Sequence, residues 1–176
     1  MPARETAVEM SEPEVPGIKL RRATAYDATA IAAVFDAAVR TGWSYLGELL
    51  REPMFSPEEW DKLVADHAPP NVLLVAIDEA GRVVGYTAAH PEDGELFLLF
   101  VDPAHSGRGI GRLLLSAAHD ALRDAGCTEA FLFTEERNER ALALYEDAGY
   151  RRDGYVRGRD FRGHPLRELR LVKQLQ

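Results

Sequence analysis

Three glycines stand at alternate positions, 107, 109 and 111, and Arg108 and Arg112 lie beside them. This segment joins an apolar run at 95–101 to an amphipathic pattern that begins at Ile110, so we expect it to lead from a strand into a helix. Uncovered backbone N–H groups at the positive end of a helix bind phosphate, and arginines add charge-assisted hydrogen bonds. The segment therefore predicts a phosphate-binding loop. The alternative is a tight strand-to-helix turn that binds nothing.

Two common phosphate motifs do not fit this loop. The dinucleotide motif Gly-x-Gly-x-x-Gly fails because Leu114 stands where the third glycine would be. The P-loop motif needs Gly-Lys-Ser/Thr, and the chain has no such run. A different phosphate ligand is expected.

The surrounding pattern predicts the elements that position this loop. Short alternating or apolar runs predict strands near 18–22 and at 72–77, 83–89, 95–101, 130–134, 150–157 and 166–173. The runs at 95–101 and 130–134 are so apolar that we expect both faces of these strands to be buried. Apolar residues at helical spacing predict helices that begin near Thr24, Ser56, Ile110 and Asn138, with capping pairs at Thr24–Asp27 and Ser56–Glu59. The last two strands are expected to flank a turn at 162–165. The order β-α-α-β-β-β-α-β-α-β-β predicts an α/β (α+β) fold with a mixed sheet and helices on both faces.

Composition narrows the class of protein. The 176 residues contain 21 basic and 29 acidic side chains, a net charge of −8, which disfavours nucleic-acid binding. One cysteine, Cys127, excludes an intramolecular disulfide and favours a cytoplasmic location. No apolar run approaches a membrane span, and the N-terminus lacks the apolar core of a secretory signal. We expect a mobile tail at 1–16 and a single domain at 17–176, with no nucleic-acid or membrane partner.

Two segments together resemble the GNAT superfamily of N-acetyltransferases. Ser106-Gly107-Arg108-Gly109-Ile110-Gly111 is similar to the family's pyrophosphate motif, Gln/Arg-x-x-Gly-x-Gly/Ala, with Ser106 where Gln or Arg is usual. The segment 138–150 is similar to the family's second motif, Asn-x-x-Ala followed by Tyr-x-x-x-Gly-aromatic. The resemblance covers about 18–173. It implies a mostly antiparallel seven-stranded sheet with a splayed central strand pair.

The resemblance also implies a ligand and the residues that bind it. Acetyl-CoA would be the acyl donor, with no metal. Its pantetheine arm would lie between the strands 95–101 and 130–134 and pair with the backbone of Leu99, Phe100 and Val101. The loop comprising Gly107, Arg108, Gly109, Ile110, Gly111 and Arg112 would bind the pyrophosphate, and Asn138 would orient the arm. Dimers are common among proteins with this resemblance, so a homodimer is an expectation too.

Acetyl transfer to an amine needs a proton donor for the leaving thiolate and a base for the amine. Tyr145 is the candidate acid; it lies two helical turns from Asn138 and so shares its face, and the alternative is core packing. Glu95, the only acidic residue on the central strand, is the candidate base, placed where we expect that strand to open toward the amine; the alternative is a solvated charge. His90 is a rival base.

Several further residues have a structural interpretation beside the functional one. Trp43 and Tyr45 would wall the acceptor pocket in such a family, or pack locally. Glu48, Glu52, Glu58 and Glu59 could favour a cationic amine, although a solvated helix face explains them as well. Cys127 is expected to be a small core residue, and the five histidines show no metal-ligand spacing. The sequence thus predicts an acetyl-CoA-dependent N-acetyltransferase that acts on a primary amine of a small molecule or peptide. The alternative is a non-catalytic acyl-CoA-binding regulatory module.

Overall fold

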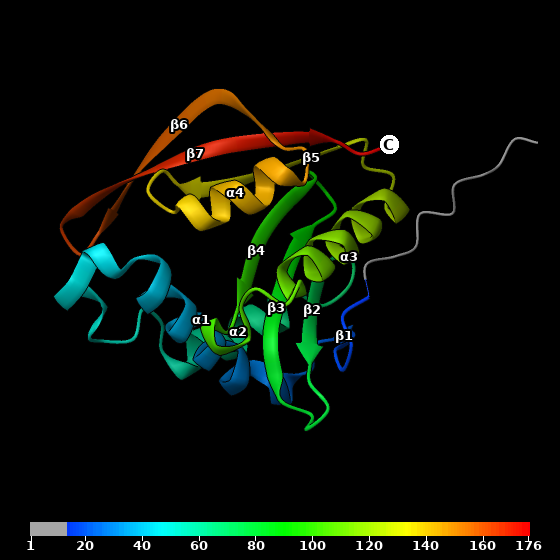
Figure 1. Ribbon diagram of the computed structural model, residues 1–176, viewed down its shortest axis with the longest axis horizontal. Helices are drawn as coiled ribbons and strands as arrows, with labels where there is room; N and C mark the ends of the chain where they lie inside the picture. Colours follow the sequence, from blue (N-terminus) through cyan, green and yellow to red (C-terminus); the bar gives the residue numbers. More distant parts are fainter. Residues whose placement is uncertain (1–13) are drawn as a thin grey trace, which may run out of the picture.

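Residues 14–176, the part of the chain that the computed structural model describes, form one seven-stranded sheet in the order β1-β2-β3-β4-β5-β7-β6 (Figure 1). Only β4 and β5 run parallel among neighbouring strands of this part. The strands are β1 Lys19–Arg22, β2 Val72–Ile77, β3 Val83–His90, β4 Glu95–Val101, β5 Glu129–Glu135, β6 Arg151–Phe161 and β7 His164–Gln174. The helices are α1 Ala28–Gly42, α2 Pro57–Asp66, α3 Ile110–Asp124 and α4 Glu139–Asp147, with 3-10 segments η1 Ala25–Asp27, η2 Ser44–Leu50 and η3 Pro103–His105. The predicted element order and mixed sheet are confirmed. Most of the tail predicted at 1–16 lies outside the described residues.

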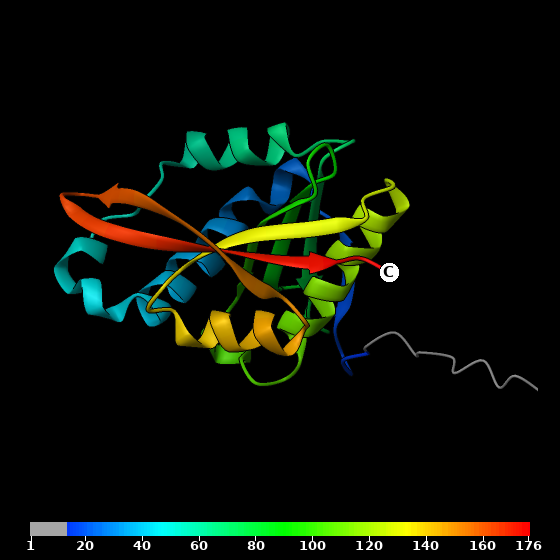
Figure 2. The same cartoon turned by 90° about the horizontal axis from the view of Figure 1, so that it is seen from above.

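Helices cover both faces of the sheet, as predicted. Figure 2 shows α1 and α2 on one side and α3 and α4 on the other. On the first side, Ile31 and Phe35 of α1 and Trp60 of α2 belong to one buried apolar cluster. On the second side, Leu122 of α3 and Leu142 of α4 belong to another. Each helix therefore packs on the sheet through the apolar face that its 3.6-residue period creates. No helix within 14–176 is long and apolar enough to cross a membrane.

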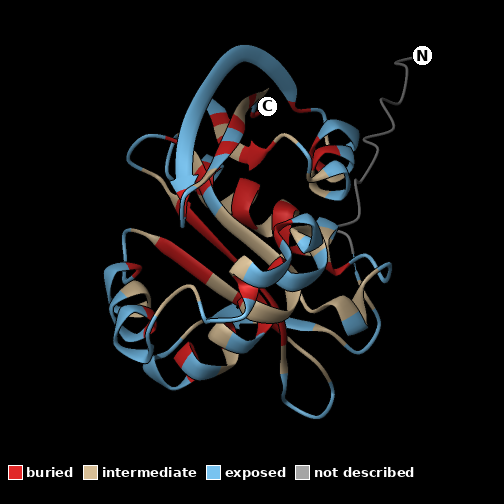
Figure 3. Cartoon of the chain, turned by 90° about the vertical axis from the view of Figure 1, so that its left-hand side faces the viewer, coloured by how far each residue is buried: buried red, intermediate tan, exposed pale blue. Residues whose placement is uncertain are grey.

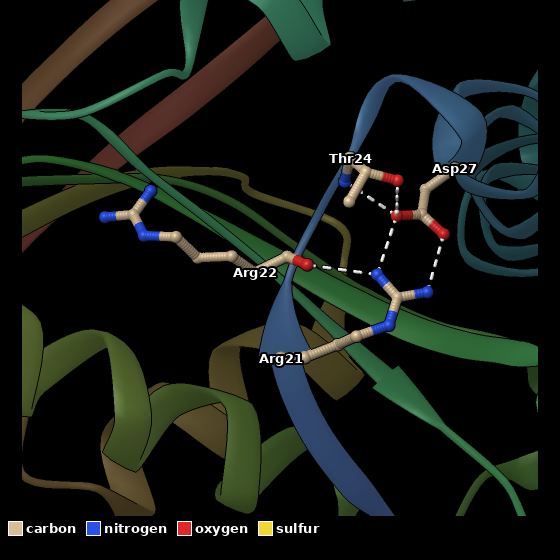
Figure 4. Close-up of polar contacts among 4 residues, drawn as sticks. All are labelled: Arg21, Arg22, Thr24 and Asp27. Atoms are coloured by element: carbon tan, nitrogen blue, oxygen red, sulfur yellow. Dashed lines mark hydrogen bonds and ion pairs between the residues drawn. The ribbon is translucent and has the colours of Figure 1, made fainter.

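Asp27 joins β1 to the start of α1 (Figure 4). Its carboxylate accepts hydrogen bonds from the Arg21 guanidinium at 2.7 and 2.8 Å and from the backbone N–H of Thr24 at 2.7 Å. The Arg21 hydrogen bond is the main cause that lowers the pKa of Asp27 to about 2. The second predicted capping pair is also present, because the Ser56 N–H donates to Glu59 at 2.7 Å and Ser56 Oγ accepts from the Glu59 N–H.

The two central strands, β4 and β5, diverge soon after they meet. Glu95 pairs with Phe131, and the Phe131 N–H donates to the Gly94 carbonyl at 3.1 Å; no later pair joins the two strands within the described residues. The predicted splay is confirmed. The prediction that both faces of β4 are buried is wrong, because only Leu96 is buried and Phe97 is 42% exposed. The missing neighbour and an irregular pairing at Phe97, where Ala88 pairs with Leu98 and Ala89 with Leu96, leave this strand open.

The burial predicted for both faces of β5 is also wrong. Its residues alternate: Ala130 and Leu132 are buried, whereas Phe131 and Phe133 are half-buried. Successive side chains of a strand point to opposite faces, so Ala130 and Leu132 lie on the buried face and Phe131 and Phe133 on the less covered one.

The β6–β7 hairpin is longer and its turn is shorter than predicted. Arg162 and Gly163 form a two-residue turn with φ of 51° and 81°, so His164 and Pro165 belong to β7 rather than to the turn. The Arg162 guanidinium donates to the carbonyl oxygens of Leu49, Glu52 and Pro53, which fixes the hairpin tip to the segment after α1. The β6 strand forms one edge of the sheet and is exposed over most of its length (Figure 3).

Candidate active site

A cavity of about 580 Å³ lies where β4 and β5 diverge. Its wall comes from the end of α1, the second half of β4, the glycine loop, the start of α3 and one face of α4. Leu99, Phe100 and Val101 contribute from β4, as predicted. Because β4 has no β5 partner beyond Glu95 in the described residues, its backbone edge can pair with an extended ligand.

The glycine loop forms one end of this cavity. Gly107 and Gly109 have φ of 76° and 88°, a region that side chains other than glycine rarely adopt, and Gly109 is the N-cap of the 15-residue helix α3. A Cβ at Gly107 would have no neighbour within 4 Å, so the backbone is bare there. Gly111, Ile110 and Arg112 also line the cavity, whereas Arg108 does not. The arrangement suits an anion at a helix N-terminus.

Helix α4 presents Asn138 and Tyr145 to the same cavity. Asn138 is the N-cap of α4, because its Oδ1 accepts from the Ala141 N–H at 3.2 Å; the residue therefore has a structural role besides its place in the wall. Tyr145 is 6% exposed and packs edge-on against Tyr150 at 5.8 Å between ring centroids. Burial raises the pKa of the Tyr145 hydroxyl, so this group stays protonated. Tyr145 thus packs in the core and also lines the cavity, so both interpretations of this residue apply.

Glu95 lies elsewhere than expected. We expected it where β4 opens, but the structure places it at the pair Glu95–Phe131, where β4 and β5 are joined. It does not line the cavity. Its Oε2 lies 3.3 Å from Nδ1 of His90, so the two rival base candidates contact each other. The error arose because the splay of parallel strands begins at their N-terminal ends and widens toward the loop, which sequence periodicity does not reveal.

The structure adds residues that sequence reasoning missed. His67, directly after α2, places its Nε2 3.0 Å from Nε2 of His90, and the two rings stack. Imidazole and carboxylate atoms of His90, Asp93 and Glu95 lie within 4.8 Å of one another. His105 lines the cavity, and its buried Nδ1 lies 3.4 Å from Oδ2 of Asp102 without a well-formed hydrogen bond among the described residues. The short spacing of His90, Asp93 and Glu95 in the sequence could have indicated their cluster. No sequence pattern indicated the contact between His67 and His90.

The remaining candidates divide between the cavity and local structure. Trp43 lines the cavity and packs edge-on against Phe161 of β6. Tyr45 lies outside it, with the Arg137 guanidinium 5.3 Å from its ring centroid. Glu48 forms an exposed ion pair with Arg51. Of the four glutamates after Trp43, Glu59 caps α2 and none lines the cavity.

Cys127 is half-buried rather than part of a fully buried core. Its Sγ donates to the Pro91 carbonyl at 3.2 Å, and its apolar contacts are with the cluster that α3 and α4 form. The structure gives it no neighbour that would activate a thiolate within hydrogen-bond distance in the described residues.

Comparison with known proteins finds a family match over the part of the chain that forms the cavity. The family model described as "Acetyltransferase (GNAT) family" matches residues 37–150, which include the glycine loop and α4. A mycothiol acetyltransferase from Propionibacterium freudenreichii is 39% identical over 103 residues, which cover 55% of this chain and 33% of that protein. One from Segniliparus rotundus is 35% identical over 129 residues, which cover 66% of this chain and 44% of that protein. The chain thus spans only a third to under a half of these relatives.

Solved structures share the fold over nearly the whole chain. The ribosomal-protein-alanine N-acetyltransferase from Brucella melitensis has a TM-score of 0.73 at 24% identity, with 89% of this chain and 99% of that chain covered. The protein yncA from Salmonella typhimurium, solved with its cofactor acetyl-CoA, has a TM-score of 0.71 at 22% identity, with 90% and 94% covered.

Proposed function

Because the chain belongs to the acetyltransferase (GNAT) family, we propose that it transfers an acetyl group from acetyl-CoA to a primary amine by direct attack. One observation carries the proposal. A single cavity runs from the bare backbone of the glycine loop, along the unpaired edge of β4, to the hydroxyl-bearing ring of Tyr145. That shape suits a ligand with a phosphate at one end and an extended amide-containing arm.

The residues of the cavity fit acetyl-CoA by chemistry as well as by shape. The N–H groups at Gly109–Gly111 would bind the pyrophosphate, and Arg112 would add positive charge at its rim. The backbone of Leu99, Phe100 and Val101 would pair with the pantetheine amides, in the way that an added strand extends a sheet. Any side chain at Gly109 would be strained because φ is positive there, so glycine leaves the backbone N–H groups of the loop uncovered.

The proposed reaction needs one proton acceptor and one proton donor. The amine nitrogen forms a bond to the thioester carbon as the carbon–sulfur bond breaks. A base takes one proton from the ammonium form of the acceptor, because such groups have a pKa of about 10.4 in water. Tyr145 donates its proton to the thiolate that leaves, and its buried hydroxyl is protonated and available for that step. The second proton that the nitrogen loses restores Tyr145.

The acceptor is a primary amine on a small molecule or a peptide. The relatives are named mycothiol acetyltransferases, which makes an amine that also carries a thiol one member of the class to test. A polyamine, an amino-acid derivative, an aminoglycoside-like amine and a peptide N-terminus are the others.

A thiol-release assay with acetyl-CoA and this set of amines tests the proposal; the thiol-bearing amine is assayed by mass spectrometry instead. We expect at least one amine to release free CoA above the rate without amine. The second candidate function is an acyl-CoA-binding regulatory module, which the retained Tyr145 in the cavity disfavours. If acetyl-CoA binds and no amine is acetylated, the module is favoured and the enzyme proposal fails.

A further inference from the structure

His105 is the last residue of η3, directly before the glycine loop, and it lines the same cavity as that loop. Its imidazole lies beside the Asp102 carboxylate, with 3.4 Å between Nδ1 and Oδ2. Asp102 is itself held in place, because its Oδ1 accepts from the Ala104 N–H at 2.9 Å and its carbonyl oxygen accepts from the His105 N–H at 2.8 Å. The turn therefore fixes one carboxylate next to one ring nitrogen of His105.

The Asp102 carboxylate determines which nitrogen of His105 can change its state. A carboxylate only accepts, so the contact is favourable when Nδ1 carries a hydrogen, whereas a lone pair there would face negative charge. Nε2 then has a lone pair in the neutral ring and an N–H in the charged ring. Nε2 makes no hydrogen bond within residues 14–176 and, unlike Nδ1, is not fully buried; the side chain is 16% exposed. This nitrogen is therefore available to a ligand in the cavity.

The basic and acidic side chains of the cavity wall balance each other. α3 and α4 contribute two of each kind: Arg112, Arg140, Glu139 and Asp147. Arg112 and Asp147 form an ion pair at 3.4 Å, so this arginine already has a partner. Arg108 belongs to the glycine loop but does not line the cavity. A pyrophosphate therefore enters a wall whose side chains have no net charge while His105 is neutral, and a protonated His105 supplies positive charge beside the loop.

The other groups around His105 do not change their charge near neutral pH. η3 packs against α1, which lines the cavity with uncharged residues only, and its two charged residues, Asp36 and Arg40, lie outside the wall. Ser106, the next residue of the chain, lines the cavity with an uncharged hydroxyl. Burial raises the pKa of Tyr145, so that group stays protonated. Among the described residues of the wall, His105 is therefore the side chain whose type titrates between pH 5 and 8.

We propose that His105 binds the pyrophosphate of acetyl-CoA together with the glycine loop, and that Asp102 is the residue that positions it. The inference rests on the proposed function, because it concerns the same ligand. In the charged ring, Nδ1–H faces Asp102 and Nε2–H donates to the pyrophosphate. An anion favours the charged form of a neighbouring imidazole, so binding to the neutral ring takes up a proton. The affinity for acetyl-CoA therefore falls as the pH rises and His105 loses its second proton.

Titration calorimetry from about pH 6 to about pH 8.5 tests the role of His105. The ligand is acetyl-dephospho-CoA, which keeps the pyrophosphate but lacks the 3′-phosphate, a monoester that itself titrates at about pH 6. We expect Kd to rise about tenfold over this range, the change for loss of one charge-assisted hydrogen bond. We also expect proton uptake, measured in buffers that differ in ionisation enthalpy.

His105→Gln should bind with neither the pH dependence nor the proton uptake. His164→Gln, in β7 and outside the cavity, is the matched control and should keep both. A Kd that does not change with pH in the parent protein, or a pH dependence that His105→Gln retains, would overturn the inference. So would a pH dependence that acetyl-CoA shows and acetyl-dephospho-CoA does not, since it would then belong to the 3′-phosphate.

A second variant tests the role of Asp102 and leaves His105 in place. Asp102→Asn keeps a side-chain oxygen that can accept from the Ala104 N–H, but it removes the negative charge beside Nδ1. We expect the pH dependence of Kd to move to lower pH, because the charged ring is then less favoured. ¹⁵N NMR of the free parent protein should show the neutral His105 ring with its hydrogen on Nδ1. An unchanged pH dependence in Asp102→Asn, or a hydrogen on Nε2 of the neutral ring, would contradict the positioning role.

The outcomes also separate this inference from the proposed function. If the ligand binds with the expected pH dependence and no amine is acetylated, the proposed function fails and the role of His105 stands. If an amine is acetylated and Kd does not change with pH, only the inference fails. If neither acetyl-CoA nor acetyl-dephospho-CoA binds at any pH, both fail.

Discussion

The Tyr150 hydroxyl and Nε2 of His119 share a hydrogen bond of 2.9 Å across the buried contact between α3 and the segment after α4. His119 is 6% exposed, and burial is the main cause that lowers its pKa to about 4. The His119 ring is therefore uncharged at neutral pH. The same Tyr150 ring packs against Tyr145, so this contact supports the wall of the cavity.

His119 should make the fold sensitive to mild acid. Its pKa is about 4 folded and 6.5 unfolded, so the unfolded chain binds more protons between these values and stability falls as pH drops from 6.5 toward 4. Between pH 7 and 5 the loss attributable to His119 is about 2 kcal/mol as an upper estimate. Urea unfolding at both pH values measures it, and this window lies above that of Asp27, whose pKa is about 2. His119→Gln should lose less stability over the window; an equal loss would contradict the assignment.

Acetyl-CoA binding should be lost when a side chain is placed in the glycine loop, but not when an equally strained side chain is placed at the other end of α3. Gly109 and Gly126 lie at opposite ends of α3 with φ of 88° and 90°, so alanine is strained at both positions. We expect Gly109→Ala and Gly126→Ala to lose similar stability, but only Gly109→Ala to lose the thermal stabilisation by acetyl-CoA. In the parent protein that stabilisation is about 2.7 kcal/mol at 100 times Kd. Equal stabilisation of the two variants, or none in the parent, would remove the loop from cofactor binding.

The same strain changes the design of a binding test at these glycines. From the sequence alone, Gly109→Val would be expected to weaken binding more than stability. Because Gly109 has a positive φ, valine at this position also lowers the stability of the fold. Gly111 has no such φ, and a Cβ there would contact only Leu144 within 3.4 Å, close to the cavity. Gly111→Val is therefore the cleaner variant. We expect its acetyl-CoA Kd to rise at least about tenfold with little change in the unfolding midpoint, measured by calorimetry and by denaturation.

Tyr145→Phe should lower kcat while acetyl-CoA affinity stays nearly constant. The variant keeps the ring against Tyr150 and removes only the hydroxyl, which acts when the thiolate forms. A decrease of about ten- to a thousandfold is expected for loss of a general acid. Tyr26→Phe, at a tyrosine that is 97% exposed, serves as the control. A kcat within about twofold of the parent would leave Tyr145 with a packing role or show that another step limits turnover.

Glu95→Gln should flatten the acidic limb of the kcat/KM profile. The amide keeps the shape of the side chain, but it cannot accept a proton from the amine. We expect a loss of about a hundredfold or more at pH 7, with partial recovery at higher pH because more of the amine is then unprotonated. An unchanged profile would exclude Glu95 from the proton transfer and make His90→Ala the next variant to measure.

Local signals were sufficient for the elements that frame the site. The apolar run 95–101 between Gly94 and Asp102 gives the bounds of β4, and the Ser56–Glu59 capping pair gives the start of α2. The seven-residue spacing of Asn138 and Tyr145 correctly placed both on one face of α4, in one cavity. In these cases the determining interactions lie within a few residues of chain.

The remaining features depend on contacts between distant segments. His67 and His90 are 23 residues apart in the chain, and they meet because the residue after α2 and the last residue of β3 lie side by side in the fold. The position of Glu95 at the joined end of the splay follows from strand pairing with Phe131, which no local pattern encodes. Pro165 suggested a turn, but it is tolerated near the start of β7, because pairing with β5 begins only at Glu168.

The central claim is that one acetyl group moves from acetyl-CoA to an amine in this cavity. Its most direct test is to quantify free CoA and acetylated amine in the same reaction by mass spectrometry, with isotope-labelled acetyl-CoA. The account predicts equal amounts of the two products with labelled acetyl on the amine nitrogen, and neither above background in Gly111→Val at the same cofactor concentration. Free CoA without acetylated amine, which is hydrolysis, or tight binding of acetyl-CoA with neither product would contradict it.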